Sequence, residues 1–69
     1  MIELRGIIRS KEDDHELVEL VVTEHRPDKY KRHRFGVDVK PNRGKIITFL
    51  AGAYGVPAGD IVWPAHIEV

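Results

Sequence analysis

A cationic stretch between His25 and Lys45 is the part of this sequence whose residue types most clearly suit a chemical task. It holds eight lysine and arginine residues and two aspartates, whereas the whole chain of 69 residues has eleven basic and eleven acidic residues. Phosphate groups are bound by several flexible cations close together, and an aromatic side chain among them can stack on a base. The run from Lys29 to Arg34, with Tyr30 inside it, has both properties. It therefore predicts a surface for nucleic acid or another polyanion.

Lys40, Arg43 and Lys45 form a second cationic group, at the start of a predicted helix. The free amides and partial positive charge of a helix N-terminus favour an anion there. The full set of predicted nucleic-acid-binding residues is Arg26, Lys29, Tyr30, Lys31, Arg32, Arg34, Lys40, Arg43 and Lys45. The alternative is that these charges only solvate a loop and protect an edge strand from aggregation. The sequence leaves open whether the two groups share one surface.

The histidines and the acidic turn do not match a metal site. His15, His25, His33 and His66 fall in different loops and strand ends and have no recognised zinc spacing. The acidic residues Glu12, Asp13, Asp14 and Glu16 lack the alternating ligands and the glycine of a calcium loop. We expect surface histidines, no bound metal and an acidic hairpin tip.

No residue pattern indicates catalysis. Ser10, Thr23 and Thr48 are the hydroxyl nucleophiles, cysteine is absent, and no serine lies in a Gly-x-Ser-x-Gly motif. The segment 41–45 lacks the first glycine of a phosphate loop, and Ile46 stands where such a loop has serine or threonine. A chain of this length also has little room to enclose a substrate. We therefore expect a non-enzymatic binding domain without a cofactor.

Three predicted strands must position the cationic run. In the first, Ile2 to Arg9, alternation places Ile2, Leu4 and Ile8 on one side and Glu3, Arg5, Ile7 and Arg9 on the other. A polar turn over 10–15 leads into a second strand, Glu16 to Glu24, with Val18, Leu20 and Val22 on one side. Pro27 ends this strand, and residues 25–32 are expected to form a loop. The third strand is predicted from His33 to Lys40, with Phe35, Val37 and Val39 pointing inward.

A helix is predicted from Pro41-Asn42 to Tyr54. Asn42 suits the N-cap, Gly55 suits the position after the last turn, and Pro57 prevents continuation. Its apolar stripe comprises Ile46, Ile47, Phe49, Leu50, Ala53 and Tyr54. One short strand is expected in the tail, in the run from Ile61 to Trp63.

These elements predict an α+β fold in the order β-β-β-α-β, with a small three- to four-stranded, mainly antiparallel sheet and one helix on one face. We expect residues 1–69 to form a single domain. No apolar run approaches the length of a membrane span or a signal peptide. The expected location is therefore the cytoplasm, without a membrane partner.

A helix covers only one face of such a sheet, and this favours an alternative function. Ile7, Leu17 and Val21 lie on the second face of the predicted hairpin, and Trp63 lies near the chain end. Exposed together, these four residues would form an apolar patch that needs a partner. They predict a protein-interaction module, either an accessory or inhibitory protein or an obligate homodimer.

The segment from Val37-Asp38-Val39-Lys40-Pro41 through Asp60-Ile61-Val62 resembles the central part of the YggU-like family of small α+β proteins. The resemblance covers about a third of the chain, and the N-terminal half and the residues after Trp63 depart from the family pattern. It implies a small α+β fold. It implies no function, because the family has no settled activity.

Overall fold

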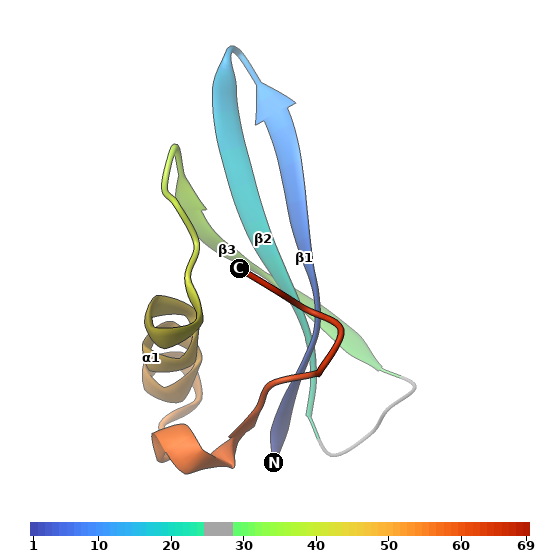
Figure 1. The fold of residues 1–69 in the computed structure, drawn as a ribbon, viewed down its shortest axis with the longest axis vertical. Helices are drawn as coiled ribbons and strands as arrows, with labels where there is room; N and C mark the ends of the chain where they lie inside the picture. The colour runs from blue at the N-terminus through green and yellow to red at the C-terminus, as the bar shows by residue number, and fades with distance from the viewer. Residues whose placement is uncertain (25–28) are drawn as a thin grey trace.

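A computed structural model describes residues 1–24 and 29–69 and shows a four-stranded sheet with one helix beside it (Figure 1). The elements are β1 (Ile2–Glu12), β2 (His15–Thr23), β3 (Tyr30–Val37), α1 (Arg43–Tyr54), the 3₁₀ turn η1 (Ala58–Asp60) and β4 (Ile61–Val62). The strand order is β3-β2-β1-β4; β2 pairs antiparallel with both β1 and β3, and β4 pairs parallel with β1. The predicted fold class and element order are confirmed.

The third strand starts and ends earlier than predicted. It begins at Tyr30 rather than His33, because Tyr30 and the two residues after it pair with the end of β2. It ends at Val37 because Asp38 adopts the left-handed conformation, with φ 55°. Tyr30, Lys31 and Arg32, the end of the predicted loop, are therefore part of an edge strand. Arg26 and the other residues of 25–28 lie outside the described part of the chain.

A β-bulge at Arg5 reverses the side-chain pattern of β1. Leu4 pairs with Val22, but the next inward pair is Ile7 with Leu20, because an extra residue is inserted between Leu4 and Gly6. The prediction that Ile7 shares a face with Arg5 was wrong: it packs against the core. Ile8, predicted to face inward, pairs with Glu19 on the other side.

A second irregularity lies in β3, beside Val18 and Glu19 of β2. It lets Phe35 turn toward α1, where its ring meets Phe49 edge to face at 5.5 Å. Beyond it, Val37 pairs with Leu17 and is 46% exposed, so the prediction that Val37 points inward was wrong. Val39, also predicted to face inward, is 39% exposed. A Cβ atom at position 36 would come within 2.6 Å of the Val39 side chain, and glycine avoids this clash.

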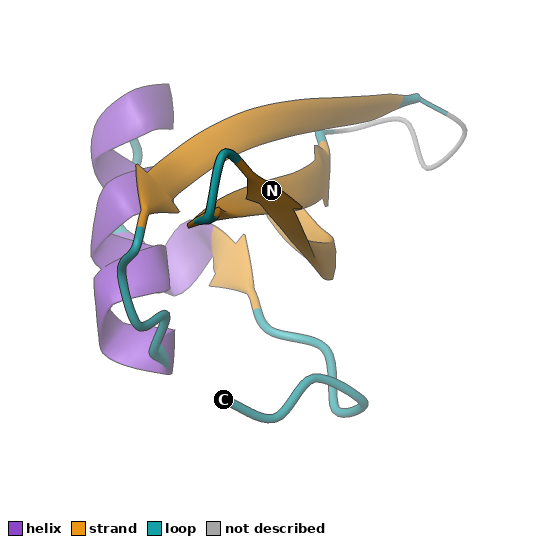
Figure 2. Ribbon diagram, turned by 90° about the horizontal axis from the view of Figure 1, so that it is seen from above, coloured by secondary structure: helices purple, strands orange, loops and turns teal. Residues whose placement is uncertain are grey.

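The helix begins and ends where the sequence predicts. The Asn42 side chain accepts a hydrogen bond from the Lys45 amide at 2.9 Å, and Gly55 ends the helix with φ 64°. Ile46 and Leu50 are fully buried, whereas Ala53, placed in the predicted apolar stripe, is exposed. The core cluster consists of Ile2, Leu4, Leu20, Val22, Ile46, Leu50 and Ile61. Figure 2 shows α1 along one side of the sheet, and the core lies between them.

Candidate functional site

The pleat of β3 divides the cationic run between two faces of the sheet. Side chains alternate along a strand, so Tyr30, Arg32 and Arg34 share one face, and Lys31 and His33 share the other. His33 lies on the helix side, because its Nε2 is 2.6 Å from the Tyr54 hydroxyl of α1. The face with Tyr30 is therefore the one that α1 does not cover.

We call this surface the open face of the sheet. From the strand register and the side-chain contacts, its members are Glu3, Arg5, Ile8, Leu17, Glu19, Val21, Tyr30, Arg32, Arg34 and Val37. Five of them, Arg5, Tyr30, Arg32, Arg34 and Val37, are exposed, and the others are half-buried. The open face thus combines three arginines, one tyrosine and a strip of aliphatic side chains.

Tyr30 is the aromatic centre of this surface. Its side chain is 57% exposed, and the Arg5 guanidinium lies over the ring, 6.0 Å from its centroid. Arg5 is held there by Glu3, whose carboxylate accepts a hydrogen bond from it at 3.0 Å. Because the guanidinium lies over one face of the ring, its own outer face is a further plane on which a base can stack.

The other two arginines of the open face differ in their partners. Arg32 donates a hydrogen bond to the Glu19 carboxylate of β2 at 2.8 Å, and this ion pair holds its guanidinium close to the sheet. Arg34 forms no ion pair with any residue of the described segments 1–24 and 29–69. Its five donors are therefore available to a ligand.

Lys31 lies on the helix side of β3, away from Arg32 and Arg34. Its ammonium is 2.8 Å from the Glu24 carboxylate, and the hydrogen bond and charge of Glu24 raise the pKa of Lys31 above its ordinary value. Nearby, partial burial raises the pKa of the Tyr54 hydroxyl, whose oxygen lies beside the His33 ring. Lys31 therefore belongs to a contact between β2, β3 and α1 and not to the open face.

The second predicted cluster lies at the start of α1. Arg43 is positioned over the Trp63 ring, 5.5 Å from its centroid, so this guanidinium links the helix to the tail. Lys40, Arg43 and Lys45 are all exposed. Because α1 packs on the opposite side of the sheet from Tyr30, the two clusters do not form one continuous surface. Lys29, next to Tyr30, is exposed at the start of β3.

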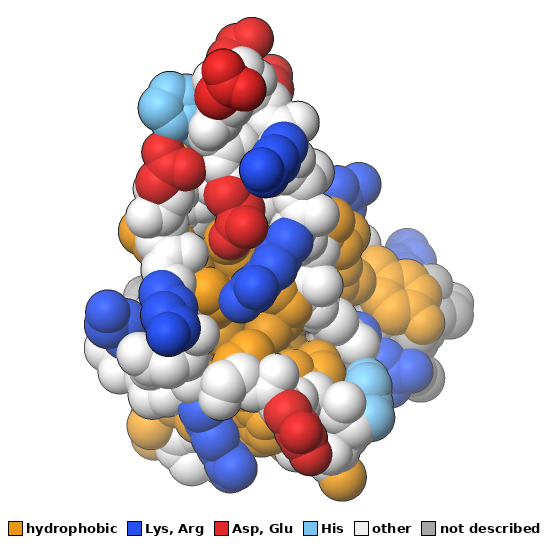
Figure 3. Space-filling model, turned by 45° about the horizontal axis from the view of Figure 1, so that its top comes forward, with side chains coloured by type: hydrophobic (Ala, Val, Ile, Leu, Met, Phe, Trp, Pro, Cys, Tyr) orange, Lys and Arg blue, Asp and Glu red, His pale blue; other side chains and the backbone are white. Residues whose placement is uncertain are grey.

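Carboxylates gather at the tip of the β1–β2 hairpin, whereas lysine and arginine side chains are spread over the rest of the view in Figure 3. The tip residues Glu12, Asp13 and Asp14 are exposed, and Asp13 and Asp14 both have positive φ, which makes the turn tight. The open face is thus acidic at its end near His15, whereas its end near Thr23 carries Tyr30 and the ion pair of Arg5 with Glu3.

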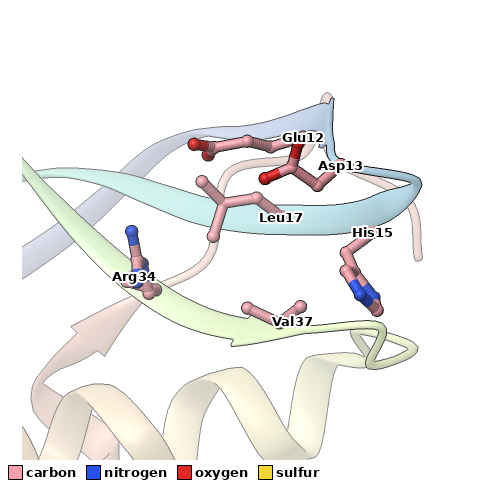
Figure 4. Close-up of a pocket in the computed structure, with 6 residues that line it drawn as sticks. All are labelled: Glu12, Asp13, His15, Leu17, Arg34 and Val37. Atoms are coloured by element: carbon pink, nitrogen blue, oxygen red, sulfur yellow. The ribbon is translucent and has the colours of Figure 1, made fainter.

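A hollow of about 250 Å³ lies between this acidic tip and β3 (Figure 4). Glu12 and Asp13 border it on one side, Arg34 and Val37 on the other, and Leu17 lies between them. His15 lines its outer end and is held by Asp38, whose carboxylate contacts the ring Nδ1. The hollow therefore presents acceptors and donors on opposite sides of an apolar floor.

Asp38 fixes the end of β3 against the start of β2. One carboxylate oxygen accepts the Glu16 amide at 2.8 Å, and the Asp38 amide donates to the Glu16 carbonyl at 2.7 Å. The Glu16 amide, followed by His15, lowers the pKa of the Asp38 carboxyl below its ordinary value. This clamp sets the position of Val37 and of His15 at the hollow.

The apolar residues predicted as a protein interface are not on one surface. Leu17 and Val21 lie on the open face, but Ile7 and Trp63 pack against the core on the helix side. The Trp63 ring nitrogen donates to the Ile67 carbonyl at 3.0 Å, which folds the tail back on itself. Ile8 takes the place on the open face that was expected for Ile7, because the bulge in β1 shifts the alternation.

Two contacts of the site are not predicted from the sequence. Arg5 is the fifth residue of the chain and is predicted only as an outward residue of the first strand, yet its guanidinium lies over the Tyr30 ring. The sequence predicts an acidic hairpin tip but not that Glu12 and Asp13 face Arg34 across the hollow. The contact of Arg5 with Tyr30 follows from the strand register, because Glu3 and Tyr30 both pair with Thr23.

Within the described residues, no group of three or more histidine, aspartate or glutamate side chains is arranged to hold a metal ion. The helix of this part of the chain is too short to cross a bilayer. Comparisons with known proteins found no matching family model, no similar curated protein and no similar solved structure.

Proposed function

We propose that this protein is a small non-enzymatic domain that binds nucleic acid through the open face of its sheet. The observation that supports the proposal most directly is the placement of Tyr30, Arg32 and Arg34 on one uncovered face, with Arg5 beside Tyr30. Stacking on aromatic and arginine planes and neutralisation of phosphates are the two interactions that such a surface provides.

The proposed binding surface is the open face alone and not the whole cationic segment 25–45. Lys31 lies on the helix side of β3, and Lys40, Arg43 and Lys45 also lie on the helix side of the sheet. The net charge of the chain is zero, so long-range attraction is weak and binding depends on local contacts. We therefore expect the affinity to fall as salt is added, but with a shallow slope, because the open face contacts few phosphates.

The experiment is a titration of labelled DNA and RNA oligonucleotides with the full chain at several ionic strengths. Arg32→Ser with Arg34→Ser is compared with Arg43→Ser and Lys45→Ser, a pair that removes the same charge from the helix start. The open-face pair should weaken binding more and should reduce the salt slope by about one for each lost phosphate contact. Absence of binding by the unmodified chain at low salt refutes the proposal, and an equal or larger loss in the helix pair moves the site to α1.

The aliphatic strip of the open face favours a second candidate function, association with a protein. Ile8, Leu17 and Val21 are half-buried, and Val37 is exposed. The tyrosine and the arginines of the open face lie beside them, and these two residue types are enriched at protein interfaces. A homodimer formed through this strip should dissociate when Leu17 and Val21 are both changed to Asp. Light scattering over a concentration series tests it, and a monomer at every concentration of the unmodified chain contradicts the homodimer.

A further inference from the structure

The hollow at the end of the open face has a set of hydrogen-bonding groups that distinguishes between nucleic-acid components. The ionised carboxylates of Glu12 and Asp13 can only accept hydrogen bonds, and the guanidinium of Arg34 can only donate them. Leu17 and Val37, which pair across β2 and β3, give it an apolar floor. A phosphate does not suit this hollow, because the two carboxylates repel it. A flat group with hydrogen-bond donors on one edge and acceptors on another suits the hollow.

Among the common bases, guanine has this arrangement. Its N1 and N2 carry hydrogens on adjacent atoms, so one carboxylate can accept from both, and its O6 and N7 are adjacent acceptors for an arginine. Adenine, cytosine and uracil each have an acceptor beside the donor that would face the carboxylate. The carboxylate can therefore accept only one hydrogen bond from these bases, and it repels the neighbouring acceptor. The acidic wall comes from the end of β1 and the turn after it, and the basic wall comes from β3. β1 and β3 are two strand spacings or about 10 Å apart, with Leu17 of β2 between them.

We propose that this hollow binds one unstacked guanine base of a single-stranded nucleic acid, with Glu12 or Asp13 accepting from its Watson–Crick edge and Arg34 donating to O6 and N7. The inference rests on the proposed function, since the strand that carries the guanine continues along β3 toward Arg32 and Tyr30. A paired base cannot enter, because its Watson–Crick edge is already occupied. The site is therefore expected to select single strands.

The test compares the affinity of the full chain for three labelled single-stranded RNA heptamers: all uridine, uridine with one central guanosine, and uridine with one central adenosine. The guanosine heptamer should bind about fivefold or more tightly than the other two. A duplex that contains the same guanosine heptamer should lose this advantage. Equal affinity for all three heptamers overturns the guanine site and leaves the proposed function intact, whereas no binding of any heptamer at low salt overturns both.

Variants at the tip separate recognition of guanine from simple charge repulsion. Glu12→Gln combined with Asp13→Asn should abolish the preference for guanosine while the all-uridine heptamer binds as well as before or better. Asp14→Asn is the matched control, because it removes a carboxylate from the same turn that does not line the hollow. It should keep the preference. A preference that survives the double variant, or that Asp14→Asn removes equally, contradicts the assignment.

Discussion

Single residues of the open face obtain their roles from neighbours that are distant in sequence. Tyr30 pairs with Thr23 and is covered by Arg5, and Arg32 is held by Glu19 of β2. These contacts reduce the rotamer freedom of long side chains before any ligand arrives, which lowers the entropic cost of binding. Arg34 is different, because no described carboxylate fixes it. Its freedom suits a residue that must adjust to a ligand in the hollow.

Asp38 is the residue for which the structure predicts a pH effect. Its pKa in the folded chain lies below the ordinary value of 3.8, so the folded state binds its proton less readily than the unfolded state. The carboxylate therefore stabilises the fold above pH of about 4, and this contribution is lost as the pH falls through the lowered pKa. Asp38→Asn keeps a side chain that tolerates positive φ but removes the charge.

The expected result is that Asp38→Asn is less stable than the unmodified chain near pH 7 and that the difference shrinks as the pH approaches 3. Urea unfolding at a series of pH values measures it. A difference in the free energy of unfolding that stays constant between pH 7 and 3 contradicts this account of the clamp.

At the scale of elements, the sequence predicts those features that depend on local chemistry. The helix begins after Asn42, whose side chain caps the first turn. It ends at Gly55, because glycine has no Cβ and adopts the left-handed conformation without a steric penalty. The second strand follows from the alternation of Val18, Leu20 and Val22, all fully buried. Each of these signals lies within a few residues of the feature that it specifies.

The bulges are the features that the sequence does not predict, and they decide which residues share a face. A bulge depends on how two strands match along their length, so neither Arg5-Gly6 nor Phe35-Gly36 identifies itself locally. A one-residue shift moves every later side chain to the opposite face. For that reason Ile7 was expected on the open face and Ile8 inside, whereas the structure has the reverse. The contact of Arg5 with Tyr30 depends on the same register.

Capping of α1 gives the prediction at this scale. Asn42→Ala removes the acceptor for the Lys45 amide, which should lower the free energy of unfolding by about 1 kcal/mol. For a domain of this size the midpoint of thermal unfolding should fall by roughly 4–8 °C. Asn42→Asp retains an acceptor at the N-cap and serves as the control, with a stability close to that of the unmodified chain. Equal losses in both variants in a thermal melt would show that the cap does not stabilise the helix.

The whole molecule is an elongated body, 35 Å along its longest axis, with the β1–β2 hairpin projecting beyond the helix and the tail (Figure 1). Its net charge of zero conceals a separation along that axis, because the hairpin tip carries Glu12, Asp13 and Asp14. A strand of nucleic acid on the open face is therefore attracted near Tyr30 and repelled toward the tip. The acidic end limits how many phosphates the face can accommodate.

This separation predicts that neutralising the tip strengthens binding. Asp14→Asn should raise the affinity for an all-uridine heptamer at low ionic strength, because one repulsive charge is removed without any change in the hollow. The gain should disappear near 1 M salt, where the screening length is about 3 Å. Glu68→Gln is the control: it also removes one negative charge, but from the tail, which packs on the helix side beside Ile7. If both variants raise the affinity equally, net charge alone governs binding; if only Asp14→Asn does, the position of the acidic tip at the end of the open face is responsible.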